Sequence, residues 1–334
     1  MRLFIKRTGL LVLAIFILCI GGCSKNDNNS GKDIKKDNDG ITVVTTIFPE
    51  YDWTRQILKD NPGSIRLDLL LDSGVDMHSY QPSADDILNI STCDVFIFVG
   101  GESEAWVDDV LKNAVNKDMV VVRLMDAIGD RLREEEHVEG MQEDCEEESE
   151  PENGEAEYDE HIWLSLKNAK ICCHAIADAL SKVDSKQKDY YEANLKLYES
   201  ILDELDGQYR EVVKTADKDT LLFADRFPFR YMTEDYGLKY FAAFSGCSAE
   251  TEASFETIAF LAAKADELSL NTILIIDGSD GKIAKTVINS SNNKERDTAV
   301  LDSMQSVTKK DMDDGAAYLD MMNKNLDVLK KVLN

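Results

Sequence analysis

The sequence predicts an α/β fold with two lobes, each with a mostly parallel sheet flanked by helices, joined by one long helix. Short β-branched runs alternate with helical patterns in both halves of the chain, and this order produces a parallel sheet covered by helices. A long amphipathic stretch without proline separates the halves. Without the N-terminal segment, roughly 290 residues remain, which is long for a single hydrophobic core.

The first 23 residues have the pattern of a lipoprotein signal peptide. Three basic residues precede an apolar run over residues 10–20, which is too short for a membrane span. The run closes on IGGC, which resembles a bacterial lipobox, so we expect cleavage before Cys23 and acylation of its thiol. A plain secretory signal is the alternative. Residues 24–40 are polar and predict a flexible linker, so the mature protein should be lipid-anchored at the extracytoplasmic face of the cell membrane.

Residues 41–184 are expected to form the N-terminal lobe. β-branched and apolar runs predict its strands, and apolar periodicity with a capping residue, Ser83, predicts its helices. The predicted strands are 41–48, 65–71, 94–99 and 119–124, and the predicted helices are 51–58, the stretch after Ser83, 103–115 and 166–183.

Residues 185–214 predict the linking helix. Apolar side chains recur at three- and four-residue spacing from Leu195 to Val212 and form one stripe. A single helix here would be roughly 40 Å long. Residues 215–334 should form the C-terminal lobe. Its predicted strands are 220–224, 239–243 and 272–276, and its predicted helices are 254–268 and 313–333.

An acidic loop, residues 134–160, lies inside the N-terminal lobe and contains no lysine or arginine. Like charges repel each other, so this segment predicts a solvated, mobile loop in which His137 cannot preorganise a site. The loop runs directly into His161. It is expected to gather cations weakly, although a merely solubilising linker is an equal alternative. Deletion of residues 135–159 is expected to leave a tight site intact.

Charge and cysteine pattern exclude several functions. The net charge of −27 argues against nucleic acid as a partner. The seven cysteines contain no C-x-x-C pair, so no zinc ribbon is predicted. Cys172 and Cys173 fall in a helical pattern and are expected to be buried. A disulfide is possible, and the sequence does not indicate which cysteines would pair.

Two of the four histidines stand at positions that favour binding. His78 lies in a loop that follows a predicted strand, and ligands in open α/β sheets bind beyond the carboxyl ends of strands. His161 follows the acidic loop and precedes Trp163. His174 is expected to be a packed or capped helix residue.

Four segments together resemble the substrate-binding lipoproteins of zinc and manganese ABC importers, a metal-binding cluster A-I type of periplasmic binding protein. They are TTIFP at 45–49, HSYQP at 78–82, EHIWL at 160–164, and the spacing of Tyr318, Met321, Met322, Asn325 and Leu326. The resemblance spans the mature chain and implies two lobes with a metal ion held between them. It also implies that His78 and His161 supply two nitrogen ligands from the first lobe.

The third ligand departs from the family pattern. The resemblance places it at Arg226, whose guanidinium group cannot coordinate a cation. Asp225 is the nearest group that can replace it. Alternatively, the site has three protein ligands and Arg226 pairs with an acidic neighbour. Asp302 resembles the fourth ligand, and Asp277 is a second acidic candidate for which a structural role is expected.

Two imidazoles and two carboxylates suit a near-tetrahedral zinc site, although the carboxylates increase tolerance for manganese. The resemblance implies the function of an extracytoplasmic solute-binding lipoprotein that delivers zinc, or alternatively manganese, to an ABC permease. We expect a monomer without enzymatic activity. A secreted metallohydrolase would need a motif such as H-E-x-x-H, which is missing from the sequence. A non-metal adhesin lipoprotein is the remaining alternative.

Overall fold

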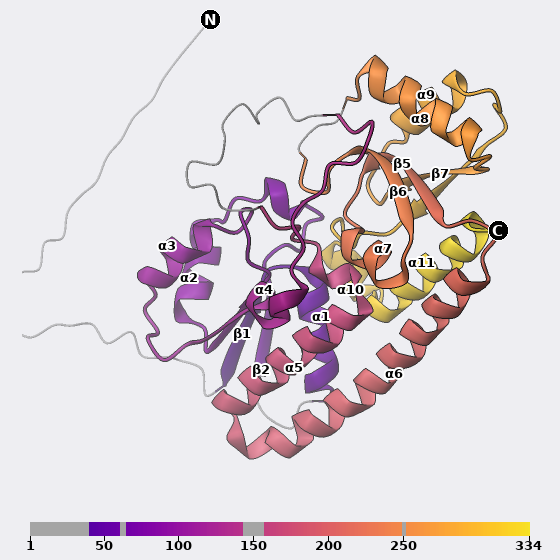
Figure 1. Cartoon of the computed structure of the whole chain (residues 1–334). Coiled ribbons are helices and arrows are strands. Elements are labelled where there is room, and N and C mark those ends of the chain that lie inside the picture. The colour runs from indigo at the N-terminus through magenta and orange to yellow at the C-terminus, as the bar shows by residue number, and fades with distance from the viewer. Residues whose placement is uncertain (1–39, 61–64, 143–156, 249–251) are drawn as a thin grey trace, which may run out of the picture. The chain divides into compact units, whose positions relative to one another are not determined.

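The computed structural model describes residues 40–60, 65–142, 157–248 and 252–334 (Figure 1). The expected signal peptide, Cys23 and the linker up to residue 39 lie outside these residues, as does Cys145. None of the helices in the described ranges is both long enough and apolar enough to cross a membrane.

Two parallel sheets form the framework, as predicted, and each has four strands. The first has the strand order β2-β1-β3-β4 and the second has the order β6-β5-β7-β8. The strands of the first sheet are β1 (Ile41–Thr45), β2 (Ile65–Leu69), β3 (Val95–Phe98) and β4 (Val120–Arg123). Those of the second are β5 (Thr220–Arg226), β6 (Lys239–Phe244), β7 (Thr272–Ile276) and β8 (Asp297–Leu301). The two sheets share one topology, a repeat that the sequence did not reveal.

Helices flank both sheets. In the first half they are α1 (Phe48–Leu58), α2 (Ala84–Thr92), α3 (Trp106–Lys112), α4 (Leu124–Ile128) and α5 (Leu166–Val183). In the second half they are α7 (Arg230–Tyr236), α8 (Phe255–Glu267), α9 (Lys282–Ser290), α10 (Lys309–Asp313) and α11 (Tyr318–Val332). Four short 3₁₀ turns occur in the described residues: η1 (Met77–Ser79), η2 (Gly129–Arg131), η3 (Ile162–Leu164) and η4 (Ser185–Gln187).

The predicted linking helix is α6 (Lys188–Thr215), a continuous helix of 28 residues and thus about 42 Å long at 1.5 Å per residue. Its apolar stripe is buried from Leu195 to Tyr209. Figure 1 shows α6 running from the side of α5 to the side of α11, and it contacts α1 and α5 of the first half and α7 and α11 of the second. Both lobes therefore share one rigid element.

Several predicted boundaries differ from the structure. The first strand ends at Thr45 instead of residue 48, because Glu50 accepts hydrogen bonds from the backbone N–H groups of Thr46 and Ile47 and starts α1 there. The terminal helix was predicted over 313–333, but α11 begins at Tyr318, because the chain ends α10 at Asp313 and turns at Gly315 with a φ of 94°. The sequence also did not predict α4, α7, α9 and β8.

One hydrophobic core extends through both lobes. Buried side chains of the first sheet, such as Val43, belong to the same cluster as Phe223 and Tyr318 of the second half. Trp53 of α1 packs edge-on against Tyr318 of α11, with ring centroids 5.1 Å apart. Cys172 and Cys173 are free and buried in α5, as expected. The C-terminal helix therefore fastens the second lobe to the first.

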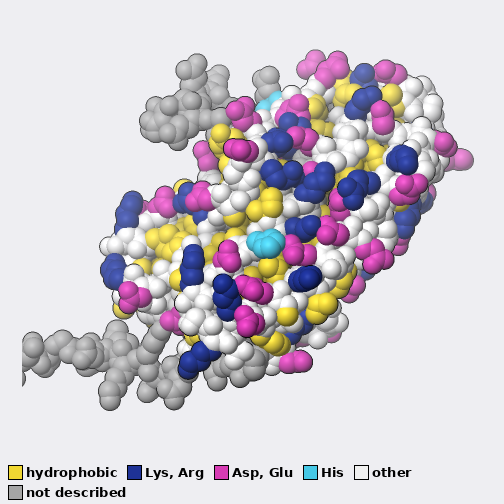
Figure 2. All heavy atoms as spheres, turned by 60° about the horizontal axis from the view of Figure 1, so that its bottom comes forward, with side chains coloured by type: hydrophobic (Ala, Val, Ile, Leu, Met, Phe, Trp, Pro, Cys, Tyr) yellow, Lys and Arg dark blue, Asp and Glu magenta, His cyan; other side chains and the backbone are white. Residues whose placement is uncertain are grey.

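The surface carries both signs of charge. On the face shown in Figure 2, acidic and basic side chains are interspersed. Within the 14 residues from 143 to 156, which lie outside the described residues, the sequence contains acidic side chains and no lysine or arginine. Part of the large net negative charge is therefore concentrated in that segment of the chain.

Candidate metal centre

His78 lies in a loop beyond the carboxyl end of β2 and is held by the turn η1. The carboxylate of Asp76 caps η1 by accepting a hydrogen bond from the backbone N–H of His78 at 3.0 Å. The Nδ1 atom of His78 lies 2.7 Å from the hydroxyl oxygen of Ser103. These two contacts fix the ring and leave Nε2 pointing away from its own loop, toward the second candidate histidine.

His161 precedes η3 and is fully buried. Asp159 accepts hydrogen bonds from its backbone N–H at 2.8 Å and from its Nδ1 at 3.0 Å. The ring packs on Trp163, with centroids 5.2 Å apart. Because Asp159 occupies Nδ1, the free nitrogen of His161 is Nε2. A carboxylate that orients an imidazole in this way is a common feature of metal sites.

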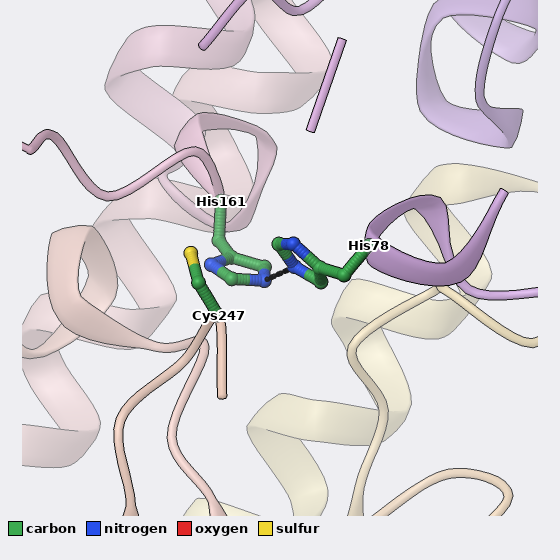
Figure 3. A group of neighbouring side chains, drawn as sticks. All are labelled: His78, His161 and Cys247. Carbon is green, nitrogen blue, oxygen red and sulfur yellow. Dashed lines mark hydrogen bonds between the residues drawn. The ribbon is translucent and has the colours of Figure 1, made fainter. Parts of the chain in front are cut away.

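The two imidazoles converge. Their Nε2 atoms are 3.1 Å apart, and Figure 3 shows the two rings facing each other from separate loops. Two Zn–N bonds of about 2.0–2.1 Å at a tetrahedral angle would place the nitrogens about 3.3 Å apart. The pair is therefore already spaced for joint coordination of one ion, as the sequence predicted for these residues.

The electrostatics of the two rings differ. Burial, followed by the neighbouring His161, lowers the pKa of His78 to about 3. Burial also acts to lower the pKa of His161, but Asp159 outweighs it, and the net pKa of His161 is raised. His78 is thus neutral at ordinary pH. The hydrogen bond between the two Nε2 atoms therefore does not need a protonated His78. A neutral imidazole is the form that binds metal.

Cys247 is a candidate ligand that the sequence did not single out. One nitrogen of each imidazole and the Cys247 sulfur all lie within 4.8 Å of one another, the one such group of three metal-binding side chains among the described residues. Figure 3 shows the sulfur on a loop of the second lobe, beside His161. Burial, Glu135 and Asp159 raise the pKa of the thiol well above its usual value. Cys247 lies in the loop that follows β6. Because ligands bind beyond the carboxyl ends of strands, this position was the feature of the sequence that could have identified Cys247 as a candidate.

Asp225 and Asp302, the two predicted carboxylate ligands, do not belong to this group. One oxygen of Asp225 accepts a hydrogen bond from the backbone N–H of Arg226, and the other is buried without a partner among the described residues. Asp302 accepts a hydrogen bond from the backbone N–H of Met304 at 2.8 Å, and burial together with Asp277 raises its pKa to about 6. Their role as ligands remains a prediction.

Arg226 pairs with an acidic neighbour, which was the second alternative for this position. Its guanidinium group lies 2.6 Å from the carboxylate of Asp76, across the two lobes. Asp76 and Arg226 also line a cavity of about 400 Å³ with Asp225 and Asp277, and neither histidine lines it. Asp277 accepts hydrogen bonds from Ser303 and Ser306, in keeping with the structural role expected for it.

The acidic loop is anchored at both ends of its described portions, 134–142 and 157–160. Glu134 and Tyr158 form an antiparallel bridge. Glu136 forms an ion pair with Arg230 at 2.6 Å, and Glu135 accepts a hydrogen bond from the backbone N–H of Cys247 at 3.0 Å. The expectation that the whole loop is solvated and mobile is therefore wrong for these ends. Residues 143–156 lie outside the described residues.

The remaining histidines do not join the centre. His137 lies in a described part of the acidic loop and is not a member of the cluster. His174 was expected to be a packed or capped helix residue. It is not packed, since 59% of its side chain is exposed, and its Nε2 lies 2.7 Å from a carboxylate oxygen of Glu199. The exposed position of His174 makes it a suitable control in experiments on the buried pair.

Two α/β lobes with parallel sheets, a joining helix and a histidine pair with converging nitrogens define the class of two-lobed solute-binding proteins. The chain belongs to the zinc-uptake complex component A family (ZnuA, periplasmic), whose family model matches residues 43–332. It is 32% identical over 332 residues to the high-affinity zinc uptake system protein ZnuA of Bacillus subtilis, covering 99% of each chain.

Solved structures agree with this assignment. The metal-dependent lipoprotein YcdH from Bacillus subtilis superimposes with a TM-score of 0.70 at 30% identity, covering 88% of this chain and 99% of that one. The Zn(II)-bound AdcA from Streptococcus pneumoniae gives a TM-score of 0.69 at 28% identity, covering 88% of this chain and 58% of that one. The chain thus spans little more than half of the streptococcal protein.

Proposed function

We propose that this protein captures a zinc ion outside the cytoplasm, between His78 and His161, and delivers it to an ABC permease. The observation that carries the proposal is the 3.1 Å separation of the two Nε2 atoms, each held in place by an oxygen partner on its other nitrogen. The family description and the zinc-related names of similar proteins support zinc as the cargo. Manganese is the alternative ion.

The proposal includes attachment to the membrane through Cys23. An acylated Cys23 would tether the binding protein and raise the local zinc concentration beside the permease. The support for this step is the sequence pattern IGGC at the end of the apolar run. The mass of the exported protein tests it, since an N-terminal diacylated cysteine is expected. An unmodified N-terminus downstream of Cys23 would contradict the lipid anchor but not the zinc site.

The lobes are expected to move little during loading and release. Trp163 of the first lobe donates a buried hydrogen bond to the carbonyl of Ser303 at 2.9 Å, and Tyr318 donates one to the carbonyl of Trp163 at 2.7 Å. Arg131 forms a further ion pair with Asp235 across the lobes at 2.8 Å. With α6 packed on both halves, small shifts of loops rather than wide closure would expose the ion to the permease.

Zinc titration of chelator-stripped protein tests the proposal. We expect one tight site in the wild type, and a large loss of affinity in both His78→Ala and His161→Ala, because each change removes one of the converging ligands. His174→Ala is the matched control and should bind as the wild type does. Trp163 packs on His161, so its fluorescence provides a direct reading of zinc binding.

The proposal fails if both histidine variants bind zinc with wild-type affinity, or if the wild type has no tight site for zinc or manganese. Circular dichroism and thermal unfolding of each variant separate a lost ligand from a lost fold. His78 is the more informative position of the two, because its loop is stabilised by the cap from Asp76 through the backbone and does not depend on the ring.

A further inference from the structure

We propose that Cys247 supplies a thiolate as the third protein ligand, so that the cargo is held by two nitrogens and one sulfur. This inference rests on the proposed function and names its substrate class: a thiophilic divalent ion such as zinc, with manganese disfavoured. The sequence left the choice between zinc and manganese open, because it expected two carboxylates beside the histidines. A sulfur ligand from the second lobe changes that expectation.

The geometry requires only a small adjustment. Zn–S bonds are about 2.3 Å and Zn–N bonds about 2.0–2.1 Å, so a tetrahedral ion separates sulfur from nitrogen by about 3.6 Å. The ligand atoms of His78, His161 and Cys247 already lie within 4.8 Å of one another. A shift of the Cys247 loop by about an ångström, or a rotamer change of its side chain, completes the three-ligand set.

The loop that carries Cys247 is positioned by its neighbours. A side chain at Gly246 would come within 2.9 Å of the carbonyl oxygen of Phe227 and 3.1 Å of the His161 ring. Only glycine therefore allows the backbone to lie this close to the imidazole. Glu135 holds the backbone of Cys247, the residue after Gly246, by accepting a hydrogen bond from its N–H group. The sulfur is thus held beside the ring from two directions.

The other positions of the second lobe where a ligand was expected do not join this cluster. Arg226, at the position where the family supplies its third ligand, is turned into the ion pair with Asp76. Asp302 caps its own turn through Met304. Within the described residues, Cys247 is the second-lobe side chain whose ligand atom reaches both imidazoles. The Cys247 sulfur thus supplies the third ligand that Arg226 cannot supply.

The chemistry of this set selects the ion. The incoming cation displaces the thiol proton, which leaves to solvent, and the resulting thiolate contributes one negative charge to the site. Soft thiolate ligands favour zinc, whereas manganese prefers oxygen ligands. Three protein ligands also leave one coordination position on a tetrahedral ion for water. An open position of this kind suits an ion that must later be transferred.

Cobalt(II) substitution of the full-length protein under reducing conditions tests the sulfur ligand directly. We expect a sulfur-to-cobalt charge-transfer band in the wild type and its loss in Cys247→Ser. Cys173→Ala is the matched control, because it removes a buried thiol of α5 and should keep the band. Zinc affinity of Cys247→Ser should fall at least about 100-fold, since changes outside the ligand shell already cost 10–100-fold.

A second variant tests the selectivity. Cys247→Asp replaces the soft ligand by a hard one, so the ratio of zinc to manganese affinity should fall relative to the wild type. A wild type that binds cobalt without the band, or a Cys247→Ser variant with unchanged zinc affinity, would overturn the inference and leave the proposed function standing. A wild type without any tight zinc site would instead overturn the proposed function itself.

Discussion

At the scale of single residues, the unusual feature beside the metal centre is a group of buried carboxyl groups. Glu50, Glu104 and Glu160 are all buried, and each has one oxygen without a hydrogen-bond partner among the described residues. Burial raises the pKa of all three, and that of Glu104 reaches about 7. Glu160 lies nearest the centre, 3.6 Å from Nδ1 of His78. Burial therefore favours the protonated form of each of these three carboxyl groups in the first lobe.

Glu104 should make stability fall as the pH rises. Its folded pKa of about 7 exceeds the unfolded value of about 4.3, so the folded protein binds more protons in between. This contribution is complete below about pH 4.3 and is lost as the pH rises through about 7. Glu104→Gln should therefore reduce the loss of unfolding free energy between pH 5 and 8 by roughly 2–3 kcal/mol.

Urea denaturation of the wild type and of Glu104→Gln at several pH values measures this difference. Glu102→Gln, a change at an exposed neighbour, serves as the control and should keep the wild-type slope. Equal pH slopes in Glu104→Gln and the wild type would mean that Glu104 is ionised in the folded protein without penalty.

At the scale of elements, the acidic loop has two parts with different roles. Its described ends contact the centre, because Asp159 orients His161 and Glu135 holds the backbone of Cys247. Deletion of residues 135–159 should therefore weaken zinc binding by about 10–100-fold, the usual cost of removing a partner that orients a ligand. This reverses the expectation from sequence that such a deletion leaves the tight site intact.

Replacement of residues 143–156 by an uncharged glycine-serine segment of equal length is the matched control. It keeps Glu135 and Asp159, so equilibrium affinity for zinc should be unchanged. Loading at low zinc and low salt should slow, because a local negative charge attracts cations. Stopped-flow tryptophan fluorescence measures the rate, and titration measures the affinity. Reduced affinity in this variant would place a ligand within the replaced segment.

At the scale of the whole molecule, the two lobes share one core and one helix. Because Val43, Phe223 and Tyr318 belong to a single buried cluster and α6 packs on both halves, unfolding of either lobe exposes core residues of the other. We expect a single cooperative urea transition. All three tryptophans, Trp53, Trp106 and Trp163, lie in the first half of the sequence, whereas far-ultraviolet circular dichroism reports both halves.

The fluorescence and circular dichroism curves should therefore coincide, which is the test of two-state unfolding. Separate midpoints would show that the lobes unfold independently and that the shared core contributes little coupling. Saturating zinc should move both curves together, since binding to the folded state stabilises by about 2.7 kcal/mol at a hundredfold excess over the dissociation constant.

The sequence by itself determined the architecture and the histidine pair. Strands and helices are local patterns, so the alternation of β-branched runs with amphipathic stretches predicted two parallel sheets and the long helix α6. The position of His78 beyond a strand end, and the resemblance that includes His161, predicted that the two rings would converge. Short helices such as α7 and the exposed strand β8 were missed, because their residues show weak periodicity.

Only the tertiary structure decided which other groups lie around the histidine pair. The sulfur of Cys247 lies beside His161, and Arg226 pairs with Asp76, in each case across the two lobes. Neither contact follows from residue spacing, because it depends on how two separate sheets are placed around a shared core. Asp225 and Asp302 satisfied the sequence pattern, but one oxygen of each carboxylate accepts a hydrogen bond from a backbone N–H one or two residues further along the chain. Hydrogen bonds of this kind cannot be predicted from the sequence alone, because they depend on the folded backbone.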